Sequence, residues 1–275
     1  MGQAPLVYRY DGSFEGFLCC VFDSVYRKEL PEDILSEEET QETLYPERWV
    51  ETDPSHAERV FSSFSKKISP AAPRFIEECF LTCQKSRERL LLRFILKGYR
   101  LGAGIMSHLN DDTVNTLVKA VKYLNNEAHL LKEFLRFSEQ NGTLAAIITP
   151  NNRVLPLLAP HFCGRYPEET FLIYDSTHRQ ALIYRPYEPA IIDLEDFSLL
   201  SPGEEEANFR AMWKVFYKTI AIEGRYNPKC RMGHMPKRYW ANMTEFEELY
   251  PQKAAYREDG ELPAMLKNNN PPLLK

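Results

Sequence analysis

The fold of this chain is decided by residues 144–184, which read LAAIITPNNRVLPLLAPHFCGRYPEETFLIYDSTHRQALIY. Within this stretch the pattern predicts a helix at Val154–Phe162 and a hairpin connection at residues 175–180, DSTHRQ. Short apolar runs predict strands at Leu144–Ile148, Thr170–Tyr174, Ala181–Tyr184 and Ala190–Ile192. This part of the chain therefore forms a small sheet with at least one covering helix.

Outward from this sheet, helices dominate the pattern. A strand at Leu6–Tyr10 precedes a helix that Ser13 caps, and further apolar stripes at helical spacing follow it. The predicted helices cover residues 14–27, 73–97, 113–138 and 204–222. The last of them should bury Phe209, Met212, Trp213, Phe216 and Ile220. We expect the α+β class, a small, mostly antiparallel sheet covered by several long helices.

Composition restricts the kind of protein further. The 275 residues include 44% apolar and 27% charged side chains, which is ordinary for a globular domain. No run approaches the roughly 18 apolar residues that span a bilayer, and the first twelve residues do not resemble a secretion signal. We expect a cytoplasmic protein with one domain over residues 1–250 and a loosely ordered tail over residues 251–275.

The net charge of −5 hides a polarised distribution. Residues 29–58 contain eleven acidic side chains and one basic one, Arg48, and short helices and loops are expected there. Residues 214–238 contain seven basic side chains and one acidic one, Glu223. Blocks of this kind are typical of solvated faces or interaction surfaces.

The six cysteines do not predict a metal or cofactor site. Cys79 and Cys83 have the spacing of two radical-SAM cluster ligands, but Ser86 stands where the third thiolate is needed. His161 with Cys163, and Cys230 with His234, would each supply only half of a zinc site. We therefore expect no bound metal and no cofactor.

Polar residues of the second long helix are candidates for catalysis. Glu127 and His129 are two residues apart, while His129, Glu133 and Arg136 are spaced to share one face. A carboxylate near a histidine can orient it for proton transfer, so Glu127, His129 and Arg136 are the catalytic candidates. A solvent-facing ladder of ion pairs is the alternative. His161, Arg165 and Asp175 flank the predicted sheet, and the first two are candidates for contact with phosphate or a partner.

The best candidate for a binding surface lies in residues 225–240. Cations there could neutralise phosphates, and aromatic faces could stack on unpaired bases. The predicted contacts are Arg225, Lys229, Arg231, Lys237, Arg238, Tyr239 and Trp240, and Tyr226 lies among them. An acidic protein surface, including residues 29–58 of this chain, is the open alternative.

Four motifs resemble one bacterial family of DNA metabolism or DNA repair proteins, whose domain carries the label DUF4130. They are Tyr10–Leu18 (YDGSFEGFL), Glu127–Phe137, Leu155–Phe162 (LPLLAPHF) and Met235–Trp240 (MPKRYW). The resemblance covers about residues 6–245. It implies a partner role, because members are encoded beside a radical-SAM protein and related domains are fused to uracil-DNA glycosylase-like domains.

Two functions follow from these observations. In the first, the protein is a nucleic-acid-binding accessory factor in DNA repair or modification that presents DNA, single-stranded or damaged, to a radical-SAM partner enzyme. In the second, it is itself an enzyme that acts on a nucleobase or nucleotide by acid/base chemistry, with Glu127 and His129 as acid and base. Salt-sensitive affinity for DNA would distinguish the two.

Overall fold

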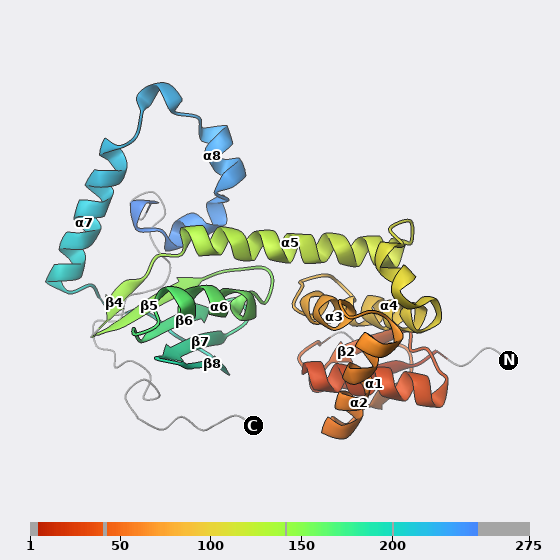
Figure 1. The fold of residues 1–275 in the computed structure, drawn as a ribbon. Helices are drawn as coiled ribbons and strands as arrows, with labels where there is room; N and C mark the ends of the chain where they lie inside the picture. Colours follow the sequence, from red (N-terminus) through yellow and green to blue (C-terminus); the bar gives the residue numbers. More distant parts are fainter. Residues whose placement is uncertain (1–4, 41–42, 141, 200, 247–275) are drawn as a thin grey trace. The chain divides into compact units, whose positions relative to one another are not determined.

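The computed structural model describes residues 5–40, 43–140, 142–199 and 201–246. The contacts group the chain into two compact units, residues 1–125 (unit 1) and residues 126–275 (unit 2). Helix α5, Asp112–Phe134, contains the division (Figure 1). The expectation of one domain over residues 1–250 stays a prediction. The predicted tail, residues 251–275, lies outside the described residues.

Unit 1 is built around a three-stranded parallel sheet in the order β2–β1–β3. Its strands are β1 (Val7–Tyr10), β2 (Asp33–Ser36) and β3 (Glu47–Trp49). Its helices are α1 (Phe14–Arg27), α2 (Pro54–Lys67), α3 (Ala72–Phe80) and α4 (Arg87–Leu101), with a 3-10 turn at Gly102–Ser107 before α5. Two of these strands lie in the acidic segment, where helices and loops were predicted. That prediction is wrong, because buried Ile34 and Leu35 carry β2 into the sheet despite their charged neighbours.

In unit 1 the sequence predicts the start of helix α1 correctly, but it does not predict the break between α3 and α4. The Ser13 side chain accepts a hydrogen bond from the Gly16 N–H at 2.9 Å, so the predicted N-cap of α1 is confirmed. The single helix predicted over residues 73–97 is wrong, because α3 ends at Phe80 and α4 begins at Arg87. Between them the Thr82 hydroxyl donates to the Cys79 carbonyl at 2.7 Å, and Ser86 has a positive φ of 50°.

Unit 2 contains a five-stranded sheet in the order β4–β5–β6–β7–β8. The strands are β4 (Ser138–Gln140), β5 (Thr143–Ile148), β6 (Phe171–Asp175), β7 (Gln180–Arg185) and β8 (Glu188–Asp193). Antiparallel pairing prevails, but β5 and β6 are parallel and are joined through α6 (Leu155–Arg165). The predicted α+β class is confirmed. The single, mostly antiparallel sheet is corrected to two sheets, one of them wholly parallel.

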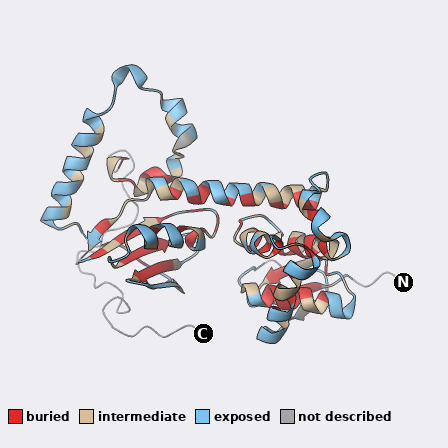
Figure 2. Cartoon of the chain, in the orientation of Figure 1, coloured by how far each residue is buried: buried red, intermediate tan, exposed pale blue. Residues whose placement is uncertain are grey.

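The rest of unit 2 is helical. It comprises α7 (Glu204–Thr219), α8 (Pro228–His234) and 3-10 turns at Glu223–Arg225, Lys237–Asn242 and Thr244–Phe246. Contacts near the end of the described chain hold α7, since Tyr217 meets the Phe246 ring edge-to-face and Trp213 donates to Glu245. None of the residues of α7 is buried (Figure 2). The predicted inward packing of its apolar stripe is therefore wrong: Phe209 is 63% exposed and Phe216 is 50% exposed.

Candidate functional site

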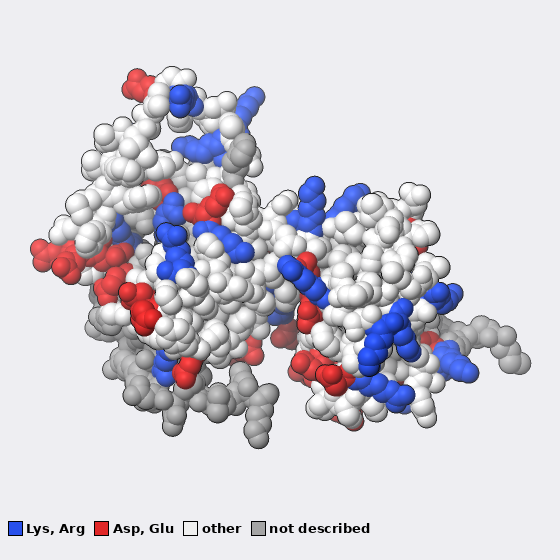
Figure 3. Space-filling view, in the orientation of Figure 1, with Lys and Arg blue, Asp and Glu red and all other residues white. Residues whose placement is uncertain are grey.

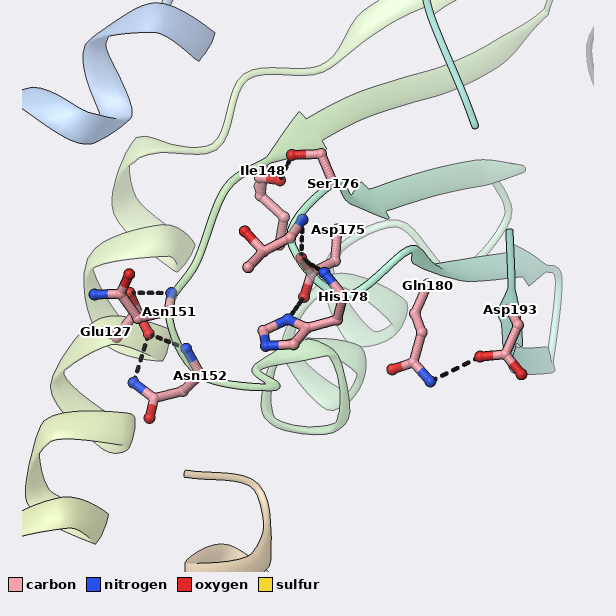
Figure 4. A network of polar contacts seen from close by, with 10 residues as sticks. Glu127, Ile148, Asn151, Asn152, Asp175, Ser176, His178, Gln180 and Asp193 are labelled. Carbon is pink, nitrogen blue, oxygen red and sulfur yellow. Dashed lines mark hydrogen bonds and ion pairs between the residues drawn. The ribbon is translucent and has the colours of Figure 1, made fainter. Parts of the chain in front are cut away.

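Two loops of unit 2 meet at the carboxyl ends of β5 and β6. Strands β5 and β6 are parallel, with Ile148 opposite Asp175. The loop over residues 149–154 and the hairpin over residues 176–179 therefore begin at the same end of the sheet. Ligands of sheets with parallel strands commonly bind at this end. The polar side chains gathered here form the candidate site (Figure 4).

Asp175 and His178 form a carboxylate–imidazole pair in the hairpin. The Asp175 side chain is only 1% exposed, and its Oδ2 lies 2.6 Å from His178 Nδ1. Its Oδ1 accepts hydrogen bonds from the backbone N–H groups of Thr177 and His178, at 3.0 and 3.1 Å. Beside the pair, the Ser176 hydroxyl donates to the Ile148 carbonyl at 3.1 Å (Figure 4). The ring of His178 is therefore held in one orientation.

This pair has the chemistry of an oriented base. A carboxylate beside Nδ1 favours the tautomer that carries its proton there, which leaves Nε2 able to accept a proton. The His178 side chain keeps 15% of its surface exposed, so a small group that reaches the hairpin can approach it. The same bonds also stabilise the turn, because an aspartate that accepts from following N–H groups is a common turn cap.

Glu127 lies at the centre of the second part of the network. Its carboxylate is fully buried and accepts from the backbone N–H groups of Asn151 and Asn152 at 3.0 and 2.8 Å. The Asn152 amide at 2.6 Å, the Arg238 guanidinium at 2.6 Å and the Tyr239 hydroxyl at 3.3 Å also donate to it. A carboxylate offers about four acceptor positions, so these donors saturate it. These contacts make Glu127 a structural anchor of unit 2, and its predicted role as acid or base stays a prediction.

His129 and Arg136 lie apart from that anchor. His129 is on the exposed side of α5, with Nε2 3.1 Å from Glu133 and its side chain 73% exposed. Arg136 pairs with Glu245 at 2.8 Å, and its guanidinium stands 5.5 Å from the centre of the Trp213 ring. The structure thus separates the three catalytic candidates, and the ion-pair ladder describes His129 and Glu133.

The predicted binding residues between positions 225 and 240 fall into two groups, those that are exposed and those that contact other parts of unit 2. Arg225, Lys229 and Lys237 are exposed. The Arg231 guanidinium lies 4.9 Å from the Trp240 ring centre and 5.3 Å from that of Phe246. Those two rings stack at 4.6 Å.

Tyr239 and Trp240 of the run lie in the interior, and Arg238 is partly buried. Arg238 pairs with the buried Glu127, while Tyr239 is 2% exposed and Trp240 is 4% exposed. The stacking role predicted for Tyr239 and Trp240 is corrected, because a base can stack only on an accessible ring face. Burial raises the pKa of Tyr239 to about 12. Their contacts hold residues 237–246 against α5 and β5.

His161 and Arg165 lie on exposed positions of α6. Burial of the ring, together with the positive charges of Lys132 and Arg165, lowers the pKa of His161. Lys132 and Arg165 form a positive pair beside the His161 ring, whose neutral form they favour. An anion would be favoured beside it, in agreement with the predicted contact to phosphate, which stays a prediction.

The described part of the chain offers no group of three or more His, Cys, Asp or Glu side chains arranged to hold a metal. Cys19, Cys20 and Cys79 are buried, and burial raises the pKa of each thiol. Cys83 and Cys230 are exposed on separate units. No helix among the described residues combines the length and apolar composition needed to cross a bilayer.

Fold and site together define an α+β protein with a buried carboxylate anchor and an aspartate–histidine pair at the carboxyl end of strand β6. The family described as a domain of unknown function, DUF4130, matches residues 85–245, which is more than half of the chain. The chain belongs to this family. No curated protein and no solved structure matches it.

His178 is the residue of this site that the sequence pattern did not single out. The hairpin over residues 175–180 was predicted and is confirmed, since Asp175 pairs with Gln180 across β6 and β7. An Asp followed three residues later by a His inside such a turn is the signal that was present. It becomes informative only once Asp175 is known to be buried.

Proposed function

We propose that this protein is a nucleic-acid-binding accessory protein of bacterial DNA repair or modification, working with a radical-SAM partner enzyme in the cytoplasm. The observation that carries the proposal is the composition of the surface on α7, α8 and the turn between them. There exposed cations and exposed aromatic rings lie in one continuous stretch, residues 209–237, which we call the basic arch.

The basic arch carries the two kinds of side chain that single strands require. Lys218, Arg225, Lys229 and Lys237 are exposed, and Lys and Arg side chains gather around the turn between α7 and α8 (Figure 3). Tyr226 is 71% exposed, and Phe209 and Phe216 are exposed on α7. Cations displace counterions from phosphates, and accessible ring faces stack on unpaired bases whatever their sequence.

Fluorescence anisotropy with a labelled oligothymidylate of about 20 nucleotides, titrated across a range of NaCl concentrations, tests the proposal. Replacing Arg225, Lys229 or Lys237 by alanine should each flatten the logarithmic salt dependence by about 0.7. Tyr226→Ala should instead lower affinity by about 1–3 kcal/mol per stacked base and leave that slope unchanged.

Lys122→Ala on the exposed side of α5 is the matched control, because it removes one cation from unit 1 and should change neither quantity. Binding that survives the simultaneous loss of all three arch cations would refute the proposal. Equal effects of the control and the arch variants would also refute it.

The proposal of a radical-SAM partner is supported by the sequence motifs, which resemble those of a family encoded beside such enzymes. Purified protein and partner should co-elute in gel filtration, and the partner's modification of DNA should need this protein. A partner that acts equally well alone would remove the accessory role while leaving nucleic-acid binding to its own test.

A second candidate function, acid/base catalysis on a nucleobase or nucleotide, is favoured by the Asp175–His178 pair. In this case His178 acts as the base and Asp175 orients it, in place of Glu127 and His129. His178→Gln should abolish product formation from labelled oligonucleotides while unfolding at the temperature of the unaltered protein. Activity that persists in this variant would leave the pair as a turn cap.

A further inference from the structure

Unit 1 contains a groove that the nucleic-acid proposal does not use. It has a volume of about 440 Å³ and is lined by residues of α1 and α2 and by Tyr99 of α4. The two helices pack side by side (Figure 1). Pockets of about 300–1,000 Å³ are the usual size of ligand sites.

The wall of the groove that α1 supplies is apolar. Val21 and Val25 are four residues apart, as are Phe22 and Tyr26, so the two pairs form adjacent ridges on the helix. Val21 is fully buried beneath the groove, whereas Val25 is exposed and Tyr26 is 76% exposed. Large apolar side chains at such spacing normally face a partner surface.

The opposite wall, on α2, is cationic. Arg59, Lys66 and Lys67 all line the groove, and no Asp or Glu is among the described residues that do so. Arg59 and Lys66 are seven residues apart, which places their backbones about 10.5 Å apart on one face of the helix. Ser63, between them, hydrogen-bonds the Tyr99 hydroxyl at 2.7 Å and so connects this wall to α4.

We propose that this groove is a docking site for an acidic amphipathic helix of a partner protein. The apolar face of that helix lies on Val25 and Tyr26, and its carboxylates face Arg59 and Lys66. Recognition of a helix by a two-helix groove uses apolar anchors at i, i+3 or i+4, and i+7. Carboxylates seven residues apart in the guest match the spacing of the two cations.

A nucleic acid fits this groove less well than a helix. Successive bases need several accessible aromatic faces, and Phe22, Tyr26 and Tyr99 are the aromatic residues of its lining. The Phe22 ring is already covered, because the His56 ring stacks on it at 3.9 Å and the Tyr26 ring lies parallel to it at 5.9 Å. Only Tyr26 presents a broad exposed ring, so successive bases would find one platform.

Selection of a displayed random library of peptides, each about 16 residues or four helical turns, tests the proposal with the full chain as target. Peptides are retained if they bind the unaltered protein and not the Val25→Asp variant. The retained peptides should carry apolar residues at i, i+3 or i+4, and i+7, with Asp or Glu at positions seven residues apart.

The strongest retained peptide is then synthesised with a fluorescent label and titrated by anisotropy. Replacing Arg59 and Lys66 together by glutamine should weaken its binding about fivefold or more, as expected for two lost surface ion pairs. Tyr26→Ser should weaken binding as well, and it removes no buried ring. Lys119→Gln with Lys122→Gln on α5 is the matched control and should change binding less than twofold.

Three results would overturn the proposal. They are a selection that yields no peptide dependent on Val25, retained peptides without acidic residues, and equal weakening in the α5 control. Displacement of the peptide by oligothymidylate, with loss of oligothymidylate binding in the Arg59 and Lys66 variant, would assign the groove to nucleic acid instead. Circular dichroism and thermal unfolding of each variant confirm that the compared proteins are folded.

Discussion

Replacing Glu127 by alanine tests whether the saturated carboxylate holds unit 2 together. The change removes the acceptor of five hydrogen bonds and leaves the Arg238 guanidinium without its buried partner. Breaking a buried ion pair from one side costs about 3–5 kcal/mol of unfolding free energy. The Arg238 side chain keeps 32% of its surface exposed and can regain water, so we expect the lower end, about 3 kcal/mol.

Urea unfolding followed by tryptophan fluorescence measures this loss, because Trp240 lies in the same unit as Glu127. In a thermal scan the same loss should lower the unfolding temperature of a unit of this size by about 6–12 °C. Glu133→Ala is the matched control on the same helix. Its carboxylate is half exposed and pairs only with His129 among the contacts of the described residues, so the cost should stay below about 0.5 kcal/mol.

A Glu127→Ala protein that unfolds within about 1 kcal/mol of the unaltered one would refute this reasoning. It would show that water or a rearranged loop replaces the carboxylate at little cost. Normal stability combined with lost activity would return Glu127 to the list of catalytic candidates. A large loss that Glu133→Ala shares would point to the helix rather than to the buried network.

Three further predictions concern single side chains. Burial raises the pKa of Tyr239 from 10.0 to about 12, so the neutral ring stabilises the fold fully below pH 10, and this contribution is lost as the pH rises towards 12. Tyr239→Phe should therefore flatten the fall in melting temperature at alkaline pH. An unchanged fall in this variant would contradict the prediction. Gly16→Ala should cost about 1–3 kcal/mol in urea unfolding, because the new Cβ collides with the Asp11 side chain, whereas Gly104→Ala meets nothing within 4 Å and serves as the control. His129→Ala should change the unfolding free energy by less than about 0.5 kcal/mol, and a loss of several kcal/mol would mean that the ring is buried in solution.

The proposed nucleic-acid surface includes the exposed apolar residues of helix α7. The apolar residues of α7 are arranged for burial, yet none is buried among the described residues. If nucleic acid stacks on Phe216 and Tyr226, hydrogen exchange at α7 should slow when oligothymidylate is added. If only a protein partner covers this helix, the oligonucleotide should leave its exchange unchanged.

Local sequence was sufficient for the elements whose signals lie within a few residues. The Ser13 cap, the hairpin over residues 175–180 and strands β5 to β8 were predicted and are confirmed, whereas β4 was not predicted and the helix expected to reach residue 138 ends at Phe134. The hydrogen bonds of the cap and of the hairpin join residues close in the chain, so the residue types alone specify them. The helix of residues 204–222 was also predicted, and α7 covers Glu204–Thr219.

Tertiary structure alone decided the meaning of the polar residues. Glu127 and Arg238 are 111 positions apart, and no spacing in the sequence indicates that one neutralises the other. Their pairing places a predicted catalytic residue in a saturated buried network, and Tyr239 of the predicted binding run donates to the same carboxylate. Periodicity reports which side of an element is apolar, but only packing between distant elements determines which polar groups lose water, and a charge that has lost water must find its partner there.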